Sequence, residues 1–298
     1  MANDSVALNS QRRRVLGMFR AEKMRPDDFA FAVKLANTQG WDMANVDFEY
    51  MSTLEPEGCF ILWQGHERIG MSTCVSYGGT GWFGNLAILP EYRRKGAGTI
   101  LVKHSIQYLK SKGVEGVGLY AYQHLVGFYR NVGFKPHDDF VVLSGTVTKE
   151  PIKHEMVLEA SEKDASKLIE LDKRCLSWDR KKLFESILLE EGKLCYYSSA
   201  ESGDIRGFIF AKVYGEMAEI GPLVCRRNEK NVAFALVSTV LDKIAGLDVY
   251  AYVPAKEEEL VALFFDSGLK EKFRATRMFL GSVAAESCIY LPESLERG

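Results

Sequence analysis

Residues with the chemistry to bind phosphate are concentrated in NLAILPEYRRKGAGTILVKH, residues 85–104. An apolar run ends there at a proline, and a helical pattern begins after two glycines. The first N–H groups of a helix have no internal partners and carry the positive end of its dipole. Gly96 and Gly98 would let an anion approach this backbone closely. Three cations add attraction: Arg93, Arg94 and Lys95. The segment therefore predicts a phosphate-binding turn.

Two better-known phosphate-binding motifs, the P-loop and the dinucleotide-binding motif, do not account for this segment. The P-loop sequence GxxxxGK[ST] does not occur in the chain. GxGxxG does occur at Gly79, Gly81 and Gly84. It precedes an apolar run instead of opening a helix, so it lacks the context of a dinucleotide site. We interpret these glycines as a hairpin turn.

The turn needs a strand before it and a helix after it, and the sequence supplies both. Val102, Ile106 and Leu109 recur at helical spacings of four and three. Gly133 is a natural C-cap for a later, short helix. The order β-β-β-α-β-α predicts an α+β fold with a mixed α/β sheet. The elements expected are helix 27–37, strands 58–64, 67–78 and 82–89, helix 98–112, strand 114–122 and helix 125–133.

The same pattern recurs later in the chain. Trp41-Asp42 matches Trp178-Asp179, an offset of 178 − 41 = 137. LVGFYRNVGFK at 125 matches LVALFFDSGLK at 260, an offset of 260 − 125 = 135. Four matches in one order predict two copies of one domain. The other pairs at offset 137 are Gly70 with Gly207, Tyr77 with Tyr214, and Gly84 with Gly221.

Domain limits follow from the repeat and from the polar segment TKEPIK, which contains a proline. We expect an N-terminal tail over 1–20, a first domain over 21–148 and a second domain over 153–298. The basic run Arg12-Arg13-Arg14 falls in the tail and is interpreted as solvated.

LAILPEYRRKGAGTILV resembles the acyl-CoA-binding motif of the GNAT superfamily of N-acetyltransferases. The family signature [QR]-x-x-G-x-[GA] is met by Arg93, Gly96 and Gly98. FYRNVGF resembles the second signature, in which a Tyr precedes x-x-x-Gly-Phe, and its Tyr129 follows Gly98 by 129 − 98 = 31 residues. The resemblance covers residues 20–143 well and the second copy in outline. It implies two GNAT-like domains in tandem, each a twisted, mostly antiparallel sheet flanked by helices.

The resemblance also implies an activity, namely acetyl transfer from acetyl-CoA to an amine of a small molecule or amino acid. Tyr129 would protonate the leaving thiolate, and splayed-strand amides would polarise the acetyl carbonyl. In many family members an Asn lies seven residues before this Tyr, and here that position is Tyr122. The strand Leu86-Ala87-Ile88 would bind the pantetheine arm. The implied cofactor-binding residues are Leu86, Ala87, Ile88, Arg93, Arg94, Lys95, Gly96, Ala97, Gly98 and Thr99.

The second copy lacks these groups. Alignment of the copies replaces Arg93, Gly96 and Gly98 by Lys230, Ala233 and Ala235, and Tyr129 by Phe264. Glu229 also places a carboxylate where phosphate would lie. We therefore expect one acetyl-CoA per chain, with the second copy as a scaffold, a lid or part of the acceptor site. The Trp-Asp pair is kept in both copies, so we interpret it as structural.

Candidates for the acceptor site are Tyr120 and Tyr122, at the end of the predicted strand 114–122, and His124, which follows it. Strand alternation is expected to make one tyrosine a core residue and the other cavity-facing. His124 is alternatively a surface residue at a helix start. Two other functions stay open: a non-catalytic acyl-CoA sensor, and an acyltransferase that uses a longer acyl-CoA.

Composition limits the remaining classes. With 38 basic and 40 acidic residues among 298, the net charge of −2 predicts neither nucleic-acid nor membrane binding. The cysteines show no metal-site spacing, so we expect reduced thiols, no bound metal and a cytoplasmic protein. The oligomeric state stays open. The six cysteines are Cys59, Cys74, Cys175, Cys195, Cys225 and Cys288.

Overall fold

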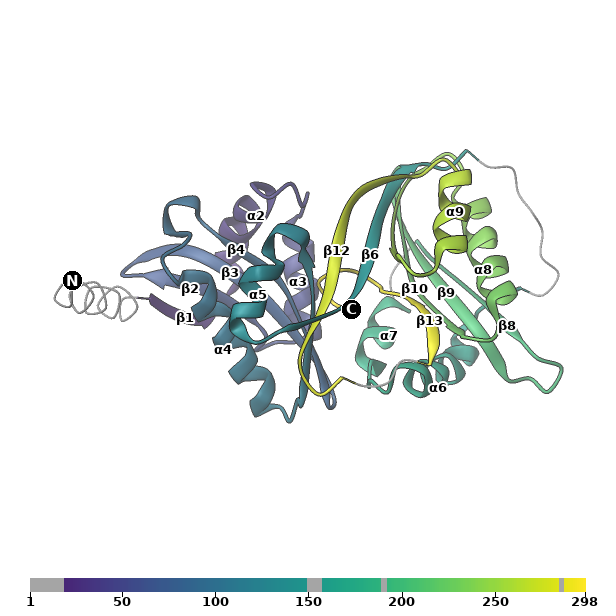
Figure 1. Cartoon of the computed structure of the whole chain (residues 1–298), viewed down its shortest axis with the longest axis horizontal. Helices are drawn as coiled ribbons and strands as arrows, with labels where there is room; N and C mark the ends of the chain where they lie inside the picture. The colour runs from purple at the N-terminus through teal and green to yellow at the C-terminus, as the bar shows by residue number, and fades with distance from the viewer. Residues whose placement is uncertain (1–18, 149–156, 189–191, 284–286) are drawn as a thin grey trace.

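The structure is a computed structural model that describes residues 19–148, 157–188, 192–283 and 287–298. Two halves lie on either side of a pair of long central strands (Figure 1). The fold is mixed α/β, with a mostly antiparallel sheet flanked by helices, as expected. The tail residues 1–18, with their basic run, and part of the TKEPIK segment lie outside the described residues. The limits of the two domains stay a prediction.

The described strands form one sheet in the order β1-β2-β3-β4-β5-β12-β6-β11-β10-β9-β8-β7, and β13 pairs with β10. The first half contributes β1 Phe19–Lys23, β2 Cys59–Gln64, β3 Glu67–Tyr77, β4 Thr80–Ile88, β5 Gly116–Tyr122 and β6 Lys135–Thr146. The second half contributes β7 Leu158–Glu159, β8 Lys193–Ser199, β9 Ile205–Tyr214, β10 Met217–Arg226, β11 Asp248–Pro254, β12 Lys270–Gly281 and β13 Cys288–Leu291.

The two halves exchange their long strands. In the sheet, β12 of the second half lies between β5 and β6 of the first, and β6 pairs with β11 of the second half (Figure 1). Met278 of β12 is fully buried in the core beneath α4 of the first half. Val141 and Leu143 of β6 are buried in the core of the second half. Each half is therefore completed by a strand of the other.

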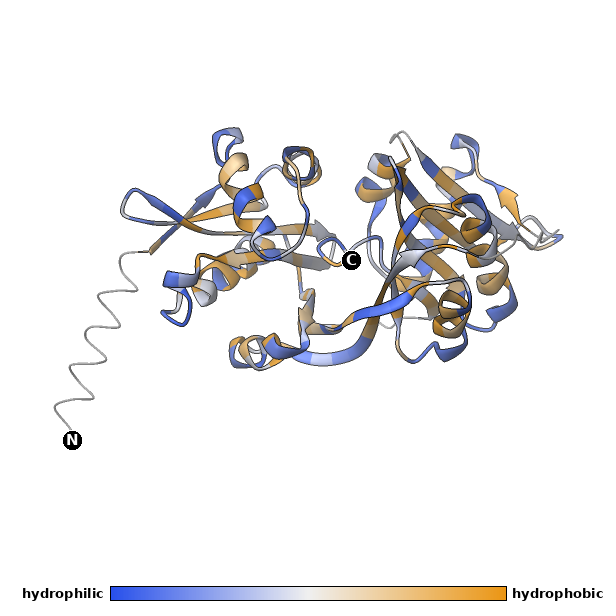
Figure 2. Cartoon of the chain, turned by 90° about the horizontal axis from the view of Figure 1, so that it is seen from above, coloured by the Kyte–Doolittle hydropathy of each residue, from blue (hydrophilic) through white to orange (hydrophobic). Residues whose placement is uncertain are grey.

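Helices cover both faces of the sheet in each half. In the first half α4 packs on one face, where Leu101 and Val102 meet Phe83. On the other face, Phe48 of α3 packs near Met71. Figure 2 shows apolar residues concentrated in strands and helices. The helices are α2 Phe29–Asn37, α3 Asn45–Leu54, α4 Ala97–Ser111, α5 Val126–Val132, α6 Ala165–Leu176, α7 Lys181–Ile187, α8 Lys230–Lys243 and α9 Glu258–Asp266.

An aromatic cluster joins the halves. Trp82 of the first half packs against Trp178 of the second, with ring centroids 5.6 Å apart, and Tyr290 also packs edge-on against Trp178. Arg180 is fully buried beside them and pairs with Asp172 at 2.6 Å. The ion pair lies within the second half, whereas the contact of Trp82 with Trp178 buries aromatic surface of both halves and so stabilises their fixed arrangement.

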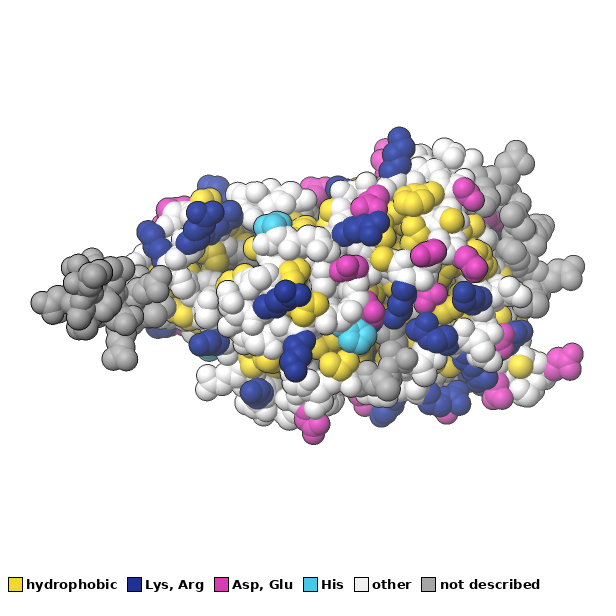
Figure 3. Space-filling model, in the orientation of Figure 1, with side chains coloured by type: hydrophobic (Ala, Val, Ile, Leu, Met, Phe, Trp, Pro, Cys, Tyr) yellow, Lys and Arg dark blue, Asp and Glu magenta, His cyan; other side chains and the backbone are white. Residues whose placement is uncertain are grey.

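The expected elements of the first half are present with shifted ends, but β1, α3 and β6 had no counterpart in the sequence prediction. All six cysteines are buried free thiols, as expected. Within the described ranges no helix has the length and apolar character to cross a membrane. No group of three or more His, Cys, Asp or Glu side chains there could hold a metal. On the face in Figure 3, cationic and anionic side chains are interspersed.

Candidate active site

The predicted phosphate turn forms the start of α4. A short 3-10 turn follows β4, and the chain then enters α4 through Gly96 and Ala97. Gly96 has φ 90° and Arg94 has φ 61°, so both are in the left-handed region. No side chain caps this end of α4, and the N–H of Ile100 bonds the Gly96 carbonyl. The N–H groups before Ile100 therefore point out of the helix end, as anion binding requires.

The three cations of the turn differ in their contacts. Arg93 donates from Nε to the Ile88 carbonyl at 2.9 Å and from Nη2 to Gln39 Oε1 at 3.1 Å, so it braces the end of β4. Arg94 and Lys95 are exposed. Lys95 lies over the ring of Tyr92. Arg94 and Lys95 are thus exposed beside the helix end, whereas Arg93 is held by hydrogen bonds to the protein.

Strand β4 diverges from β5 just before this turn. Residues 80–82 of β4 pair with 116–118 of β5, and no strand of the described chain pairs with residues 83–88 on that side. On the β3 side the register shifts between Gly84 and Ala87, and Asn85 there has φ 51°. The predicted pantetheine strand, Leu86-Ala87-Ile88, thus has one edge available for backbone hydrogen bonding.

Tyr129 lies on α5, next to this divergence. Its ring packs against Phe83 of β4, with centroids 6.4 Å apart, and against Phe128 and Phe134. The residue is 5% exposed. Burial raises the pKa of its phenol above the ordinary value of about 10. The phenol therefore holds its proton at neutral pH and can act as a donor.

The acceptor candidates occupy the other side of β5. Tyr120 and Tyr122 are two residues apart on one strand, so both side chains lie on the same face. The prediction that alternation would separate them is wrong. The Tyr120 ring packs between Trp82 and Phe140, with centroids 5.1 and 4.9 Å away. Tyr122 instead accepts a hydrogen bond from the indole of Trp41 at 3.0 Å.

His124 is an exposed residue of the short turn 123–125, and its ring stacks on that of Tyr122. The Trp-Asp pairs differ between the copies. Trp178 is buried in the aromatic cluster, so its predicted structural role is confirmed. Trp41 is only partly buried and contacts Tyr122. Trp41, Tyr122 and His124 therefore form one group at the edge of the divergence.

In the second half β10 diverges from β11 in the same way, but another strand, β13, pairs with β10 beyond that point. Only residues 217–220 of β10 pair with β11. Residues 223–226 of β10 pair instead with β13, which is almost completely buried. The backbone edge that corresponds to 86–88 of the first half is thus already hydrogen-bonded. No signal in the sequence pointed to this strand.

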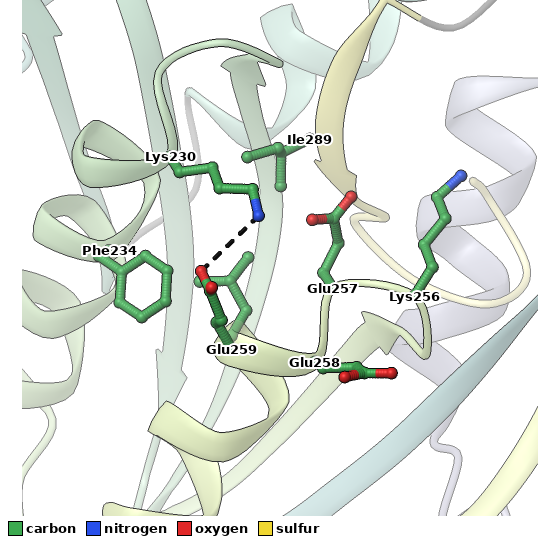
Figure 4. A pocket seen from close by; sticks show the side chains of 8 residues that line it. Lys230, Phe234, Lys256, Glu257, Glu258, Glu259 and Ile289 are labelled. Atoms are coloured by element: carbon green, nitrogen blue, oxygen red, sulfur yellow. Dashed lines mark ion pairs between the residues drawn. The ribbon is translucent and has the colours of Figure 1, made fainter.

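The turn before α8, which aligns with the predicted phosphate turn of the first half, also lacks the features that would bind phosphate. Glu229 forms a two-pronged ion pair with Arg206, and Ala233 and Ala235 are buried in the core. Phe264, in place of the tyrosine, is fully buried. A hollow of about 140 Å³ remains beside this turn, where Lys230 pairs with Glu259 (Figure 4). Its lining residues are Lys230, Phe234, Lys256, Glu257, Glu258, Glu259, Leu260 and Ile289.

After β13 the chain crosses from the second half to the first through residues 292–298, here called the crossing segment. A Cβ added to Gly221 would lie 2.0 Å from the Pro292 carbonyl oxygen, and one added to Gly84 would lie 2.5 Å from Cβ of Glu296. Gly84 and Gly221, which the repeat aligns with each other, are therefore both covered by the crossing segment. The indole of Trp82 also donates to the Leu295 carbonyl at 3.1 Å.

Comparisons with known proteins agree with this arrangement. A family model described as the acetyltransferase (GNAT) family matches residues 25–134, and one described as an acetyltransferase (GNAT) domain matches 168–288. No curated protein matches the chain.

Solved structures share the fold along most of the chain. A candidate acetyltransferase from Pyrococcus horikoshii has TM-score 0.77 and 21% identity, covering 94% of this chain and 96% of its own. A GCN5-related N-acetyltransferase from Sphaerobacter thermophilus has TM-score 0.65 and 16% identity, covering 89% and 96%. A tandem GNAT protein from the clavulanic acid biosynthesis pathway has TM-score 0.61 and 13% identity, covering 90% and 100%.

Proposed function

Because the chain belongs to the GNAT acetyltransferase family, with two such domains in tandem, we propose that it transfers an acetyl group from acetyl-CoA to an amine. The acceptor is a small molecule or an amino acid, and the first half carries the chemistry. The observation that supports this most directly is the divergence of β4 from β5. In the first half no described strand pairs there, whereas in the second half β13 does.

In this proposal the cofactor lies between β4 and the helices α4 and α5. The outward N–H groups at the start of α4 bind the pyrophosphate, with Arg94 and Lys95 adding charge. Backbone groups of residues 86–88 bond the pantetheine arm. Gly98 lies where a side chain would point between Ile88 and Phe128, so a glycine there leaves room for the arm.

The reaction is direct attack of the amine on the thioester carbonyl. The C–N bond forms and the C–S bond breaks, and Tyr129 gives its proton to the leaving sulfur. The surplus proton on the attacking nitrogen then passes to the phenolate through water, which restores the phenol. Backbone N–H groups freed by the irregularity at Asn85 stabilise the oxygen that becomes negative, as in an oxyanion hole. The buried phenol suits this role, because a raised pKa keeps the proton available at neutral pH.

The experiment is a screen of amines and amino acids that follows release of free CoA thiol from acetyl-CoA. We expect release that depends on the amine, together with the acetylated amine by mass spectrometry. Butyryl- and palmitoyl-CoA run in parallel identify an enzyme that prefers longer acyl groups. Tight acetyl-CoA binding without turnover of any amine would instead indicate an acyl-CoA sensor and contradict the proposal.

A further inference from the structure

Four aromatic side chains from both halves lie together where β5 ends. Tyr122, the last residue of β5, accepts a hydrogen bond from the indole of Trp41 at 3.0 Å. The centroid of its ring lies 5.0 Å from that of Phe273, on β12 of the second half, and 5.8 Å from that of His124. These four residues, here called the aromatic group, thus bring together segments that are far apart in the chain.

The strand register places Tyr122 at the divergence of β4 from β5. The last paired residues are Trp82 of β4 and Gly118 of β5. Tyr122 lies four residues beyond Gly118 (122 − 118 = 4). Leu86 lies as far beyond Trp82 (86 − 82 = 4), so Tyr122 and Leu86 reach about the same level on the separating strands. Tyr122 is therefore across the divergence from the strand that is proposed to bind the pantetheine arm.

Hydrogen bonds also connect the aromatic group with the end of β4. Arg93 donates from Nε to the Ile88 carbonyl at 2.9 Å and from Nη2 to Gln39 Oε1 at 3.1 Å. Gln39 lies two residues before Trp41, and the indole of Trp41 reaches Tyr122 on β5. The chain from Gln39 to Trp41 therefore bridges the divergence, with one end held at β4 and the other at β5.

The aromatic group lies on the face of the sheet opposite the proposed acid. Tyr129 packs with Phe83 and Phe134 on the face that α4 and α5 cover. Ala121 of β5 belongs to the same core, and because side chains alternate along a strand, Tyr122 points to the opposite face. Since α4, α5 and their core occupy the first face, an amine that attacks the thioester must approach from the face of Tyr122.

Exposure distinguishes the aromatic group from the aromatic cluster that joins the halves. The rings of that cluster are buried, as Trp178 is. Trp41, Tyr122 and Phe273 are only partly buried, and His124 is exposed. Ligand sites are typically lined by aromatic side chains that stay accessible and are held by a few polar contacts. The aromatic group has these properties, and a flat apolar ligand can stack on its rings.

The backbone that presents Trp41 differs from that of its repeat partner. Trp41 lies between Gly40, with φ 74°, and Asp42, with φ 51°. A residue with a side chain is rarely left-handed, and such conformations are found most often at functional sites. In the second copy Asp179 does not have a positive φ, and Trp178 is buried in the core. The left-handed aspartate thus belongs to the copy whose tryptophan reaches the divergence.

We propose that the aromatic group is the acceptor site, and that the acceptor is a primary amine on a short alkyl chain that ends in a planar aromatic ring. The inference rests on the acetyl transfer proposed above and narrows its acceptor class. Trp41 and Phe273 hold the aromatic ring by stacking and edge contacts, so that the nitrogen reaches the thioester past Tyr122. Because Phe273 belongs to β12, the strand exchange makes the acceptor site a product of both halves.

The first test compares acceptors that differ only in the ring. Phenethylamine and 2-cyclohexylethylamine have the same alkyl chain and nitrogen, but the cyclohexyl ring is puckered and has no π face. Butylamine gives the rate without a ring. We expect kcat/KM, followed as release of CoA thiol, to be roughly tenfold higher for phenethylamine than for the cyclohexyl compound, because ring contacts add to the burial of area. Butylamine should be ~10²-fold poorer than phenethylamine, since it buries less apolar surface.

The second test removes the rings of the protein. Phe273→Leu keeps an apolar side chain and should lower kcat/KM for phenethylamine roughly tenfold, with butylamine turnover and acetyl-CoA affinity unchanged. Trp41→Leu should have the same effect, and Trp41→Phe, which keeps a ring, should retain most of the preference. Phe265→Leu, the same change at an exposed ring of α9, is the matched control and should leave the preference intact. Thermal unfolding verifies that each variant is folded.

The outcomes separate this inference from the function on which it rests. If the native protein acetylates no amine, the proposed function fails and the inference falls with it. If the native protein uses butylamine or the cyclohexyl compound as well as phenethylamine, the inference alone is overturned. It is also overturned if the ring preference survives in both folded Leu variants, because the ring is then bound elsewhere. A rate loss that is equal for all three amines would indicate a purely structural role and contradict the inference as well.

Discussion

Tyr129 shows how burial fits a single residue to its proposed role. Three aromatic neighbours hold the ring and leave only 5% of the residue exposed. A phenol in this setting loses its proton only well above neutral pH, because burial disfavours the charged form. The aligned position in the second half is Phe264, which fills the same kind of core without a hydroxyl.

Tyr129→Phe removes only the hydroxyl, so the ring packing and the melting temperature should be retained. We expect kcat to fall by ~10²-fold or more at nearly constant acetyl-CoA affinity, because the thiolate would leave unprotonated. Stopped-flow kinetics under conditions where chemistry limits the rate, with calorimetry for affinity, measure this. A kcat within about twofold of the native value would show that water or another group protonates the thiolate.

At the scale of the element, the two glycines at the start of α4 have different roles. Gly96 has φ 90°, so any side chain there strains the backbone whether or not a cofactor binds. A Gly96→Val variant should therefore lose stability as well as affinity, which makes it a poor test. At Gly98 an added Cβ would only touch the ring of Phe128 at 3.4 Å, an ordinary contact.

Gly98→Ala is consequently the cleaner test of the cofactor position. The methyl group would point between β4 and α5, where the pantetheine arm is proposed to lie, and should weaken acetyl-CoA binding at least tenfold. Titration calorimetry measures the affinity and thermal unfolding measures the fold. Gly79→Ala, in the exposed hairpin turn at the other end of β4, should leave affinity unchanged. Equal affinities for both variants would place the cofactor elsewhere.

At the scale of the whole molecule, the two halves share one architecture but differ at the point where their strands diverge. In the second half β13 pairs there, and in the first half no described strand does. Calorimetric titration of the intact chain should therefore give about one acetyl-CoA per chain. The second half offers β13 in the place of the pantetheine arm and an engaged Glu229 in the turn. A stoichiometry near two, or cofactor density beside Glu229 in a crystal, would contradict this reading of the second half.

Strand exchange also predicts that the halves unfold together. Met278 comes from the second half but is buried in the core of the first. Met278→Ala should lower the free energy of unfolding by ~2–5 kcal/mol, as for other large-to-small core changes. Differential scanning calorimetry should show one transition, shifted as a whole. Two separate transitions, with only one displaced, would mean that the halves are independent.

The sequence by itself determined the features that depend on neighbouring residues. The helical spacing of Val102, Ile106 and Leu109 and the glycines before it located α4, because amphipathic periodicity and a left-handed turn are local properties. The offset of 137 residues revealed the tandem repeat, since both copies keep the same turns. The family signatures then located the turn and Tyr129 within the first copy.

Only the tertiary structure decided which parts of the two copies meet. Strand pairing joins residues far apart in the chain, so the exchange of β6 and β12 had no local signal. The same holds for β13, which fills the divergence of β10, and for Glu296, which lies on Gly84 some 200 residues away in sequence (296 − 84 = 212). In the sequence Glu219 is one more polar strand residue, and only the folded chain places the hydroxyl of Tyr252 beside its carboxyl. The environment of such a side chain is created by tertiary packing, and the spacing of neighbouring residues does not determine it.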